Sequence, residues 1–299
     1  MSSLTRSSGT DCSTRCAMHR NDMQSLMTMK PEVTVIIPTY KPQAYLYECL
    51  DSVFSQTLDK DMFEVVVVLN GCNEPYRSGV AQWIGRHGDL QARLLQTDTP
   101  GVSNARNIGI ENARGANICF IDDDDRVSRG YLEALKEEIK SPDCMAVADV
   151  RNFDEDGNVS GDDYIARAYR RFYGRKTAPL LSGRSFLSSS CCKMIPRTMI
   201  GGHRFDCRFR IGEDSLFMAS ITDGLKTIRI AGDAAVYFRR VRMESASRSR
   251  KSRAFLVGNM FRTWGAYARI YLSDPARYNL VFFMTRIAAV AMSHIGKMK

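Results

Sequence analysis

The strongest constraint on the fold is a fourfold alternation between residues 33 and 139. In each unit a short run rich in β-branched residues precedes a stretch whose apolar residues recur at helical spacing. The predicted strand and helix pairs are 33–37 with 45–54, 63–69 with 75–85, 92–95 with 102–113, and 117–121 with 130–139. Consecutive units of this kind predict an α/β, Rossmann-like fold, with a mostly parallel sheet flanked by helices and loops gathered at the carboxyl ends of its strands.

The fourth predicted strand ends in four aspartates, Asp122, Asp123, Asp124 and Asp125. Because open α/β sheets bind ligands at the carboxyl ends of their strands, these carboxylates are expected at a binding site. Oxygen ligands without nearby His or Cys favour Mg²⁺ or Mn²⁺ over zinc. The alternative is a solvated turn, but neighbouring carboxylates repel one another unless a cation or basic side chains neutralise them.

The composition shows a basic excess. Lys and Arg number 42 against 33 Asp and Glu, which indicates an anionic partner such as a nucleotide phosphate or a phospholipid headgroup. The basic residues are spread without a recognition module, so no nucleic-acid partner is expected. Nine scattered cysteines form no disulfide framework and predict a reduced, cytoplasmic protein.

The two ends of the chain differ from the α/β region. Residues 1–30 lack the apolar segment of a signal peptide, and we expect a disordered tail. Residues 251–299 have a helical pattern whose apolar part is interrupted by Arg286 and His294 and is too short for a membrane span. We expect a C-terminal helical extension that is buried or touches an anionic membrane surface, peripherally on the cytoplasmic face of the inner membrane.

The intervening region alternates less clearly. Strands are predicted at 144–150, 185–195, 227–230 and 234–238, and helices at 163–171 and 213–222. The segment 239–253 carries seven basic residues and predicts an anion-binding or solvated loop.

Five stretches in order resemble the family 2 glycosyltransferases, which have the GT-A fold and invert the anomeric carbon. They are Val-Thr-Val-Ile-Ile-Pro-Thr-Tyr at 33–40, Glu-Cys-Leu-Asp-Ser-Val-Phe-Ser-Gln-Thr at 48–57, Ser-Asn-Ala-Arg-Asn-Ile-Gly at 103–109, Phe-Ile-Asp-Asp-Asp-Asp at 120–125 and Gly-Glu-Asp at 212–214. The resemblance implies a GT-A domain at 31–250, between the tail and the helical extension.

This resemblance also implies a nucleotide-sugar donor, with a UDP-sugar as the default. Asp122 and Asp124 stand at the positions of the family's Asp-x-Asp element, which contacts the ribose and a divalent metal. Asp123 belongs to the same donor-binding run, and Asp125 is a supporting acid. Arg239, in the basic segment, is a candidate contact to the diphosphate.

Inverting transfer needs a carboxylate that deprotonates the acceptor hydroxyl, and the resemblance assigns this role to Asp214 with Glu213 in support. The alternative is that this pair only caps a helix. Arg106 and Asn107 are expected to hold phosphate or to order the aspartates, with an ion pair between Arg106 and the acids as the open alternative.

Three residues at the ends of predicted strands complete the expected donor site. Tyr40 offers an aromatic face to the nucleotide base and Pro38 precedes it. Asn70 stands where the family often has an aspartate that recognises the base, and its amide oxygen keeps an acceptor there.

The resemblance favours single-sugar transfer to a hydroxyl of a glycan or polyprenyl-linked acceptor in bacterial surface polysaccharide or glycolipid synthesis. The chain has no Gln-x-x-Arg-Trp stretch and no long apolar spans, which argues against a processive synthase. Two alternatives remain. One is a degenerate GT-A fold acting as a non-catalytic scaffold. The other is a nucleotidyltransferase, which is expected to have a Gly-rich phosphate loop with a lysine after its first strand, and Pro-Thr-Tyr-Lys-Pro at 38–42 is not such a loop.

Overall fold

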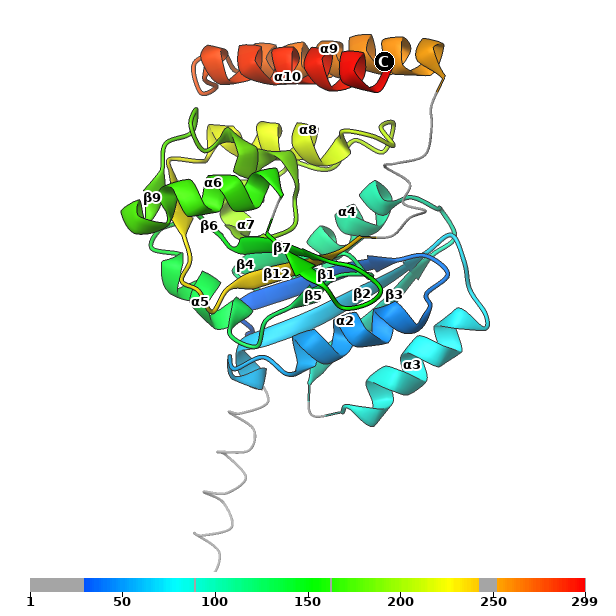
Figure 1. Cartoon of the computed structure of the whole chain (residues 1–299). Helices are drawn as coiled ribbons and strands as arrows, with labels where there is room; N and C mark the ends of the chain where they lie inside the picture. Colours follow the sequence, from blue (N-terminus) through cyan, green and yellow to red (C-terminus); the bar gives the residue numbers. More distant parts are fainter. Residues whose placement is uncertain (1–29, 89, 162, 242–251, 299) are drawn as a thin grey trace, which may run out of the picture.

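An eight-stranded sheet forms the centre of the molecule (Figure 1). The computed structural model describes residues 30–88, 90–161, 163–241 and 252–298. The strand order is β3-β2-β1-β4-β10-β6-β11-β9. Its parallel half consists of β1 (Val33–Thr39), β2 (Phe63–Asn70), β3 (Gln91–Thr97) and β4 (Asn117–Phe120). β1 and β2 are buried along their whole length, as expected for parallel strands covered on both faces.

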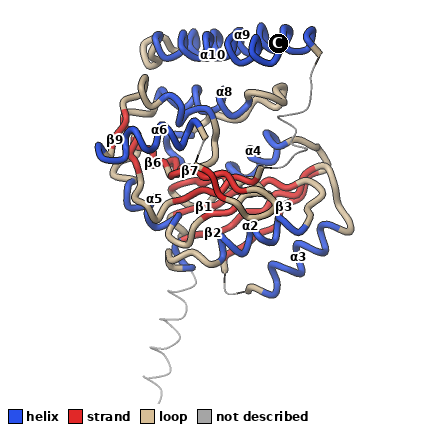
Figure 2. The backbone as a smooth tube through the Cα atoms, viewed as in Figure 1, coloured by secondary structure: helices blue, strands red, loops and turns tan. Residues whose placement is uncertain are grey.

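Helices follow the parallel strands and cover both faces of the sheet, as the backbone tube in Figure 2 shows. They are α2 (Ala44–Phe54), α3 (Tyr76–Arg86), α4 (Val102–Asn112) and α5 (Tyr131–Glu138), with the short helix η1 (Lys60–Met62) before β2. α4 packs closely on β1, because a Cβ at Gly109 would lie only 2.4 Å from Cγ2 of Ile36. The four predicted strand and helix units are confirmed.

The second half of the sheet contains β6 (Cys144–Val147), β9 (Thr177–Ala178), β10 (Lys193–Pro196) and β11 (Thr227–Ile230). β10 is antiparallel to both of its neighbours, β4 and β6. The prediction of one strand over 144–150 is wrong, because the chain leaves the central sheet after β6 and continues as β7 (Asp149–Phe153) in a second sheet.

The predicted strand at 185–195 is also wrong over most of its length. Residues before β10 form the short helix η3 (Arg184–Ser188), in which Phe186 and Leu187 are both buried instead of alternating. Cys192 has a φ of 66°, which breaks an extended chain. The ammonium of Lys193 donates to the carbonyls of Ser189 and Cys191, both at 2.5 Å, and so holds the coiled backbone.

A smaller sheet of four strands lies over the end of β4. Its order is β5-β12-β7-β8, with β5 (Arg126–Val127), β12 (Val236–Arg240) and β8 (Val159–Ser160). β12 pairs with β5 directly after the aspartate run. This pairing brings residues more than one hundred positions apart in sequence to the same edge of the molecule.

The remaining helices form the upper layers in Figure 1. They are α6 (Tyr164–Phe172), η2 (Tyr173–Arg175), α7 (Arg197–Ile200), α8 (Glu213–Ser220), η4 (Ile221–Asp223), α9 (Arg253–Ser273) and α10 (Leu280–Met298). α9 and α10 pack together as the outermost layer, and their side chains Tyr267, Phe282 and Phe283 are buried. The hydroxyl of Tyr278 donates to the carbonyl of Ser220 at 2.8 Å, which ties this pair to α8.

No helix in the described part of the chain is long and apolar enough to cross a membrane. Most of the predicted tail and residues 242–251 of the basic segment lie outside the described residues. The division into a tail, a GT-A domain and a helical extension therefore stays a prediction, as does contact with a membrane surface.

Candidate functional site

Asp125, the last residue of the aspartate run, links the run to β12 of the smaller sheet. Asp125 is 3% exposed, and its carboxylate accepts from the Tyr237 hydroxyl at 2.7 Å and from the backbone N–H of Arg240 at 2.8 Å. Burial, together with the charges of Asp122 and Asp124, raises the pKa of the Asp125 carboxyl. The Tyr237 oxygen also accepts from the backbone N–H of Asp122, so one tyrosine holds both ends of the run.

The other three aspartates are half-buried on the turn after β4. Asp123 accepts from the hydroxyl of Thr39 at 2.6 Å, which links the run to the end of β1. The carbonyl of Asp124 accepts from Nε of Arg240 at 2.9 Å. These contacts fix the turn, and both side chains of the predicted Asp-x-Asp pair, Asp122 and Asp124, keep partial exposure.

Arg106, on α4, joins the aspartate run to a carboxylate far along the chain. It is 3% exposed, and its two terminal nitrogens donate to Oδ1 of Asp122 and Oδ1 of Asp214, each at 2.7 Å. The ring of Phe205 packs against the guanidinium at 5.3 Å. Burial alone lowers the pKa of Arg106, but the carboxylates of Asp214 and Asp122 outweigh it and raise that pKa. The ion-pair alternative for Arg106 is therefore the arrangement that the structure has.

Asp214 and Glu213 form the first turn of α8. The residue at the N-cap is Gly212, whose φ of 89° suits glycine, so neither acid occupies the capping position. Oδ1 of Asp214 also accepts from the hydroxyl of Ser190 at 3.1 Å. Burial, followed by the charge of Asp214, raises the pKa of Glu213 to about 6. The two acids differ, since one is ion-paired and the other is held in a largely desolvated position.

The residues expected around a nucleotide lie at the ends of β1 and β2. Tyr40 is 48% exposed, whereas Pro38 is buried within β1. Asn70 is buried, and its amide donates to the carbonyl of Thr39 at 2.7 Å and accepts from the N–H of Gly101 at 2.9 Å. Asn70 thus ties the end of β1 to the turn before α4, and its contact with a base stays a prediction.

The side chains of Asn107 and Arg239 bind residues outside the aspartate run. Asn107 exchanges two hydrogen bonds with the backbone of Phe205, at 2.8 and 2.9 Å, and so orders the chain before α8 instead of the aspartates. Arg239 pairs with Asp163 at 2.7 Å, and Asp163 in turn caps α6. A contact between Arg239 and a diphosphate stays a prediction.

Several residues of this network carry no strong sequence signal. Tyr237 lies in the strand predicted at 234–238, but the apolar pattern does not show that its side chain meets the aspartates. Arg240 was predicted in the basic loop, whereas it is the last residue of β12. Lys193 is 1% exposed, and burial lowers its pKa. The one visible signal was a charged residue beside the apolar pair Met194 and Ile195.

The described residues contain no group of three His, Cys, Asp or Glu side chains that could hold a metal. A cation that takes part of its ligands from substrate phosphates needs only one or two protein carboxylates. Asp122 and Asp124 can supply these, because both are partly exposed and only one oxygen of Asp122 is bound by Arg106.

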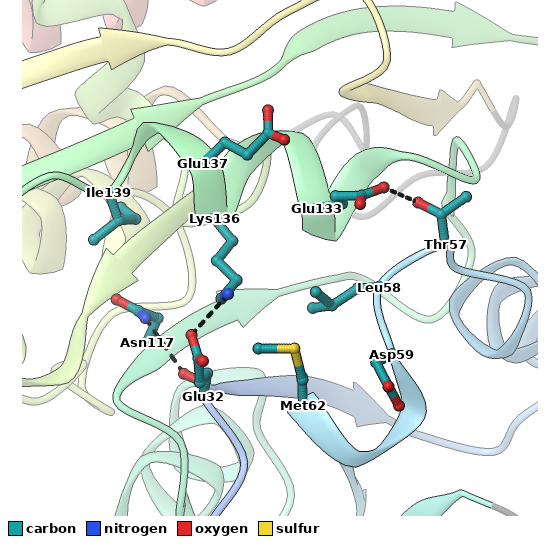
Figure 3. A pocket seen from close by; sticks show the side chains of 10 residues that line it. All are labelled: Glu32, Thr57, Leu58, Asp59, Met62, Asn117, Glu133, Lys136, Glu137 and Ile139. Carbon is teal, nitrogen blue, oxygen red and sulfur yellow. Dashed lines mark hydrogen bonds and ion pairs between the residues drawn. The ribbon is translucent and has the colours of Figure 1, made fainter.

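A cavity of about 550 Å³ lies at the end of the sheet opposite to the aspartate run (Figure 3). Glu32 precedes β1, Asn117 begins β4, and Lys136 pairs with Glu32 at 3.0 Å in its wall. Because it lies at the amino ends of the strands, this cavity is separate from the aspartate run.

The parallel half-sheet, with a carboxylate network at the carboxyl ends of its strands, defines an α/β protein of the open-sheet class, which binds ligands at that end of the sheet. The family described as glycosyl transferase family 2 matches residues 34–201. The chain belongs to glycosyl transferase family 2 and carries a glycosyltransferase domain, which confirms the predicted family.

Among curated relatives, the chain is 30% identical over 193 residues to glycosyltransferase GlyG of Streptococcus pneumoniae, covering 60% of this chain and 63% of that protein. It is 27% identical to the poly(ribitol-phosphate) β-N-acetylglucosaminyltransferase TarS of Staphylococcus aureus, covering 69% of this chain and 35% of TarS. The chain spans only 21%, 31% and 63% of the lengths of GlyA, EpsJ and GlyG.

Two solved structures show the same fold. TarS residues 1–349 in complex with UDP-GlcNAc superpose with a TM-score of 0.63 at 21% identity, covering 79% of this chain and 66% of that one. The mannosyltransferase PcManGT from Pyrobaculum calidifontis, in complex with GDP-Man and Mn²⁺, gives 0.56 at 20% identity, covering 86% and 72%. The predicted GT-A fold is confirmed.

Proposed function

We propose that the protein transfers one sugar from a nucleotide-sugar donor to an acceptor hydroxyl and inverts the anomeric carbon. The observation that carries this proposal is the Arg106 bridge, in which one buried guanidinium binds Asp122 on the donor side and Asp214 on the acceptor side. The bridge holds the two partly exposed carboxylates on one guanidinium, as a donor side and an acceptor side that meet at one carbon require. The family and the neighbours that hold UDP-GlcNAc and GDP-Man support a nucleotide-sugar donor, with a UDP-sugar first.

On the donor side, Asp122 and Asp124 would hold Mg²⁺ or Mn²⁺ together with phosphate oxygens of the donor. When bound, the cation neutralises the negative charge that develops on the leaving nucleoside diphosphate. Tyr40, with its exposed ring, would stack on the base, and Asn70 and Pro38, which are both buried, would support the base site from the ends of β2 and β1.

On the acceptor side, Asp214 would act as the general base. Both recorded hydrogen bonds to its carboxylate, from Arg106 and from Ser190, go to Oδ1. Oδ2 then takes the hydroxyl proton as the acceptor oxygen bonds to the anomeric carbon. The bond from that carbon to the diphosphate oxygen breaks with its electron pair on the leaving group, which inverts the centre.

The biological setting proposed is bacterial surface polysaccharide or glycolipid synthesis, with a glycan or polyprenyl-linked acceptor. One relative is named as a minor teichoic acid biosynthesis protein of Bacillus subtilis. The outer face of α9 and α10 exposes Phe261, Leu272, Val281 and Met292, which supports peripheral contact with a membrane on the cytoplasmic side.

A donor screen tests the proposal. The protein is incubated with UDP-GlcNAc, GDP-mannose and other nucleotide sugars with Mn²⁺, and released nucleoside diphosphate is measured. We expect release that is abolished by a chelator and by Asp124→Asn, but retained in Asp156→Asn, an exposed aspartate in the turn before β8. If the wild type binds a nucleotide sugar and never releases its nucleoside diphosphate, the scaffold alternative replaces this proposal.

A further inference from the structure

A second cavity, of about 440 Å³, lies between the first turn of α8 and the helix pair α9 and α10. Ile211, Gly212 and Ser215 form one wall, and Asn259, Thr263 and Arg286 form the facing wall. The cavity therefore begins at the residues on either side of Glu213 and Asp214. On the proposed function, a molecule in this cavity approaches the acceptor side of the catalytic base.

The cavity wall has basic side chains and no acidic ones. Its lining residues include two arginines and one histidine, and they include no Asp or Glu. Nδ1 of His294 lies 2.9 Å from the carbonyl of Val290, and its Nε2 lies 3.2 Å from the amide nitrogen of Asn259. The permanent positive charges of the wall are those of Arg286 and of Arg184, which donates to the carbonyl of Leu181.

Arg286 is the distinctive member of this wall. It is 8% exposed, and its recorded partners are neutral: the Tyr267 hydroxyl at 3.4 Å and the carbonyl of Arg184 at 3.5 Å. Both contacts lie at the long limit for a hydrogen bond. In the described parts of the chain, no carboxylate forms an ion pair with Arg286, whereas the equally buried Arg106 binds two. A desolvated guanidinium with five donors is stable beside an anion and costly without one.

The contacts of Arg286 lead back to the proposed catalytic base. Nε of Arg286 donates to the Tyr267 oxygen, and the Tyr267 hydroxyl donates to Oγ of Ser215 at 3.0 Å. Ser215 follows Asp214 directly on α8. A chain of two hydrogen bonds therefore links Arg286 to the residue that follows the proposed base.

We propose that this cavity binds a phosphate ester carried by the acceptor, with Arg286 as its counter-ion. Ala289 and Val290, together with Ile211, offer apolar contact to the carbon chain next to the phosphate. This inference rests on the proposed function, because it treats the cavity as the acceptor side of Asp214. A phosphate ester occurs both in lipid-linked acceptors and in polyol-phosphate polymers, and the test separates these two sources.

The test uses calorimetric titration with hexyl phosphate, glycerol phosphate and hexanol. The protein is first saturated with UDP and Mn²⁺ so that phosphate cannot enter the donor site. We expect both phosphate esters to bind and hexanol not to bind, and we expect Arg286→Met to weaken phosphate binding at least tenfold. Tighter binding of hexyl phosphate indicates a lipid-linked acceptor, and tighter binding of glycerol phosphate indicates a polyol-phosphate acceptor.

Arg277→Met is the matched control, because Arg277 is 59% exposed, pairs with Asp223 and lies outside the cavity. It should bind the phosphate esters as the wild type does. If Arg286→Met does not fold, Ser293→Asp serves instead, because it places a negative charge in the cavity wall and should abolish binding. Equal binding by the wild type and the cavity variant, or no binding of any phosphate ester, overturns the inference. Binding of UDP, measured first, tests the proposed donor separately.

Discussion

Removing the Arg106 side chain should destabilise the protein and uncouple its two carboxylates. In Arg106→Met the guanidinium is replaced by an apolar chain, and Asp122 and Asp214 each lose a hydrogen bond of 2.7 Å. A hydrogen bond to a charged group contributes about 1.5 to 3 kcal/mol, so two of them contribute about 3 to 6 kcal/mol. Because the two carboxylates are 40% and 21% exposed and can rehydrate, we expect the lower limit, about 3 kcal/mol.

The assay is urea denaturation of Arg106→Met, Asp214→Asn and the double variant. We expect the double variant to be more stable than the sum of the two single effects predicts, by about 1 to 2 kcal/mol, because either change alone breaks the same contact. Arg204→Met is the control, since Arg204 forms an exposed pair with Glu111 at 3.5 Å and should change stability by less than about 0.5 kcal/mol. Additive effects of Arg106→Met and Asp214→Asn would refute the bridge.

Three further changes probe the surrounding network. The pKa of Glu213 is raised from 4.5 to about 6, so its stabilising contribution is present below pH 4.5 and is lost as the pH rises through 6. Glu213→Gln should therefore be more stable than the wild type by about 2 kcal/mol at pH 8 and equal to it near pH 4. A difference in stability that does not change with pH would contradict this. Tyr237→Phe leaves the buried carboxylate of Asp125 without one donor and should lower the free energy of unfolding by about 1 to 3 kcal/mol; an unchanged urea midpoint would show that this hydrogen bond is dispensable. Asn107→Ala should lower stability by about 1 to 2 kcal/mol and speed amide hydrogen exchange at Phe205, and unchanged exchange there would argue against its anchoring role.

The parallel half of the sheet was predictable because its signals are local. The β-branched run that becomes β2 and the helical spacing that becomes α4 each lie within about a dozen residues, and both elements end within a residue of the predicted positions. The predicted strand at 185–195 failed for the opposite reason. A buried lysine, Lys193, orders that backbone through hydrogen bonds to two carbonyls. The spacing of apolar residues along the sequence does not reveal such contacts.

The candidate site, too, was predictable only where its signals are local. Asp122 and Asp214 stand out in the sequence because their motifs are local. Arg106 links them although it lies 16 positions from Asp122 and 108 positions from Asp214, and only tertiary packing brings the three residues together. The cavity at Arg286 had even less sequence signal, since its residues come from α6, η3, α8 and the two residues before it, α9 and α10. Arg286 itself was visible only as an interruption of an apolar helix.

The most direct test of the account is the rate of nucleoside diphosphate release by Asp214→Asn, measured beside its affinity for UDP with Mn²⁺. If Asp214 is the base, release in the presence of acceptor should fall by about 10² to 10⁴-fold, while UDP affinity stays close to that of the wild type. A variant that keeps wild-type turnover, or that loses UDP binding to the same extent as turnover, would contradict the assignment of Asp214 to the acceptor side.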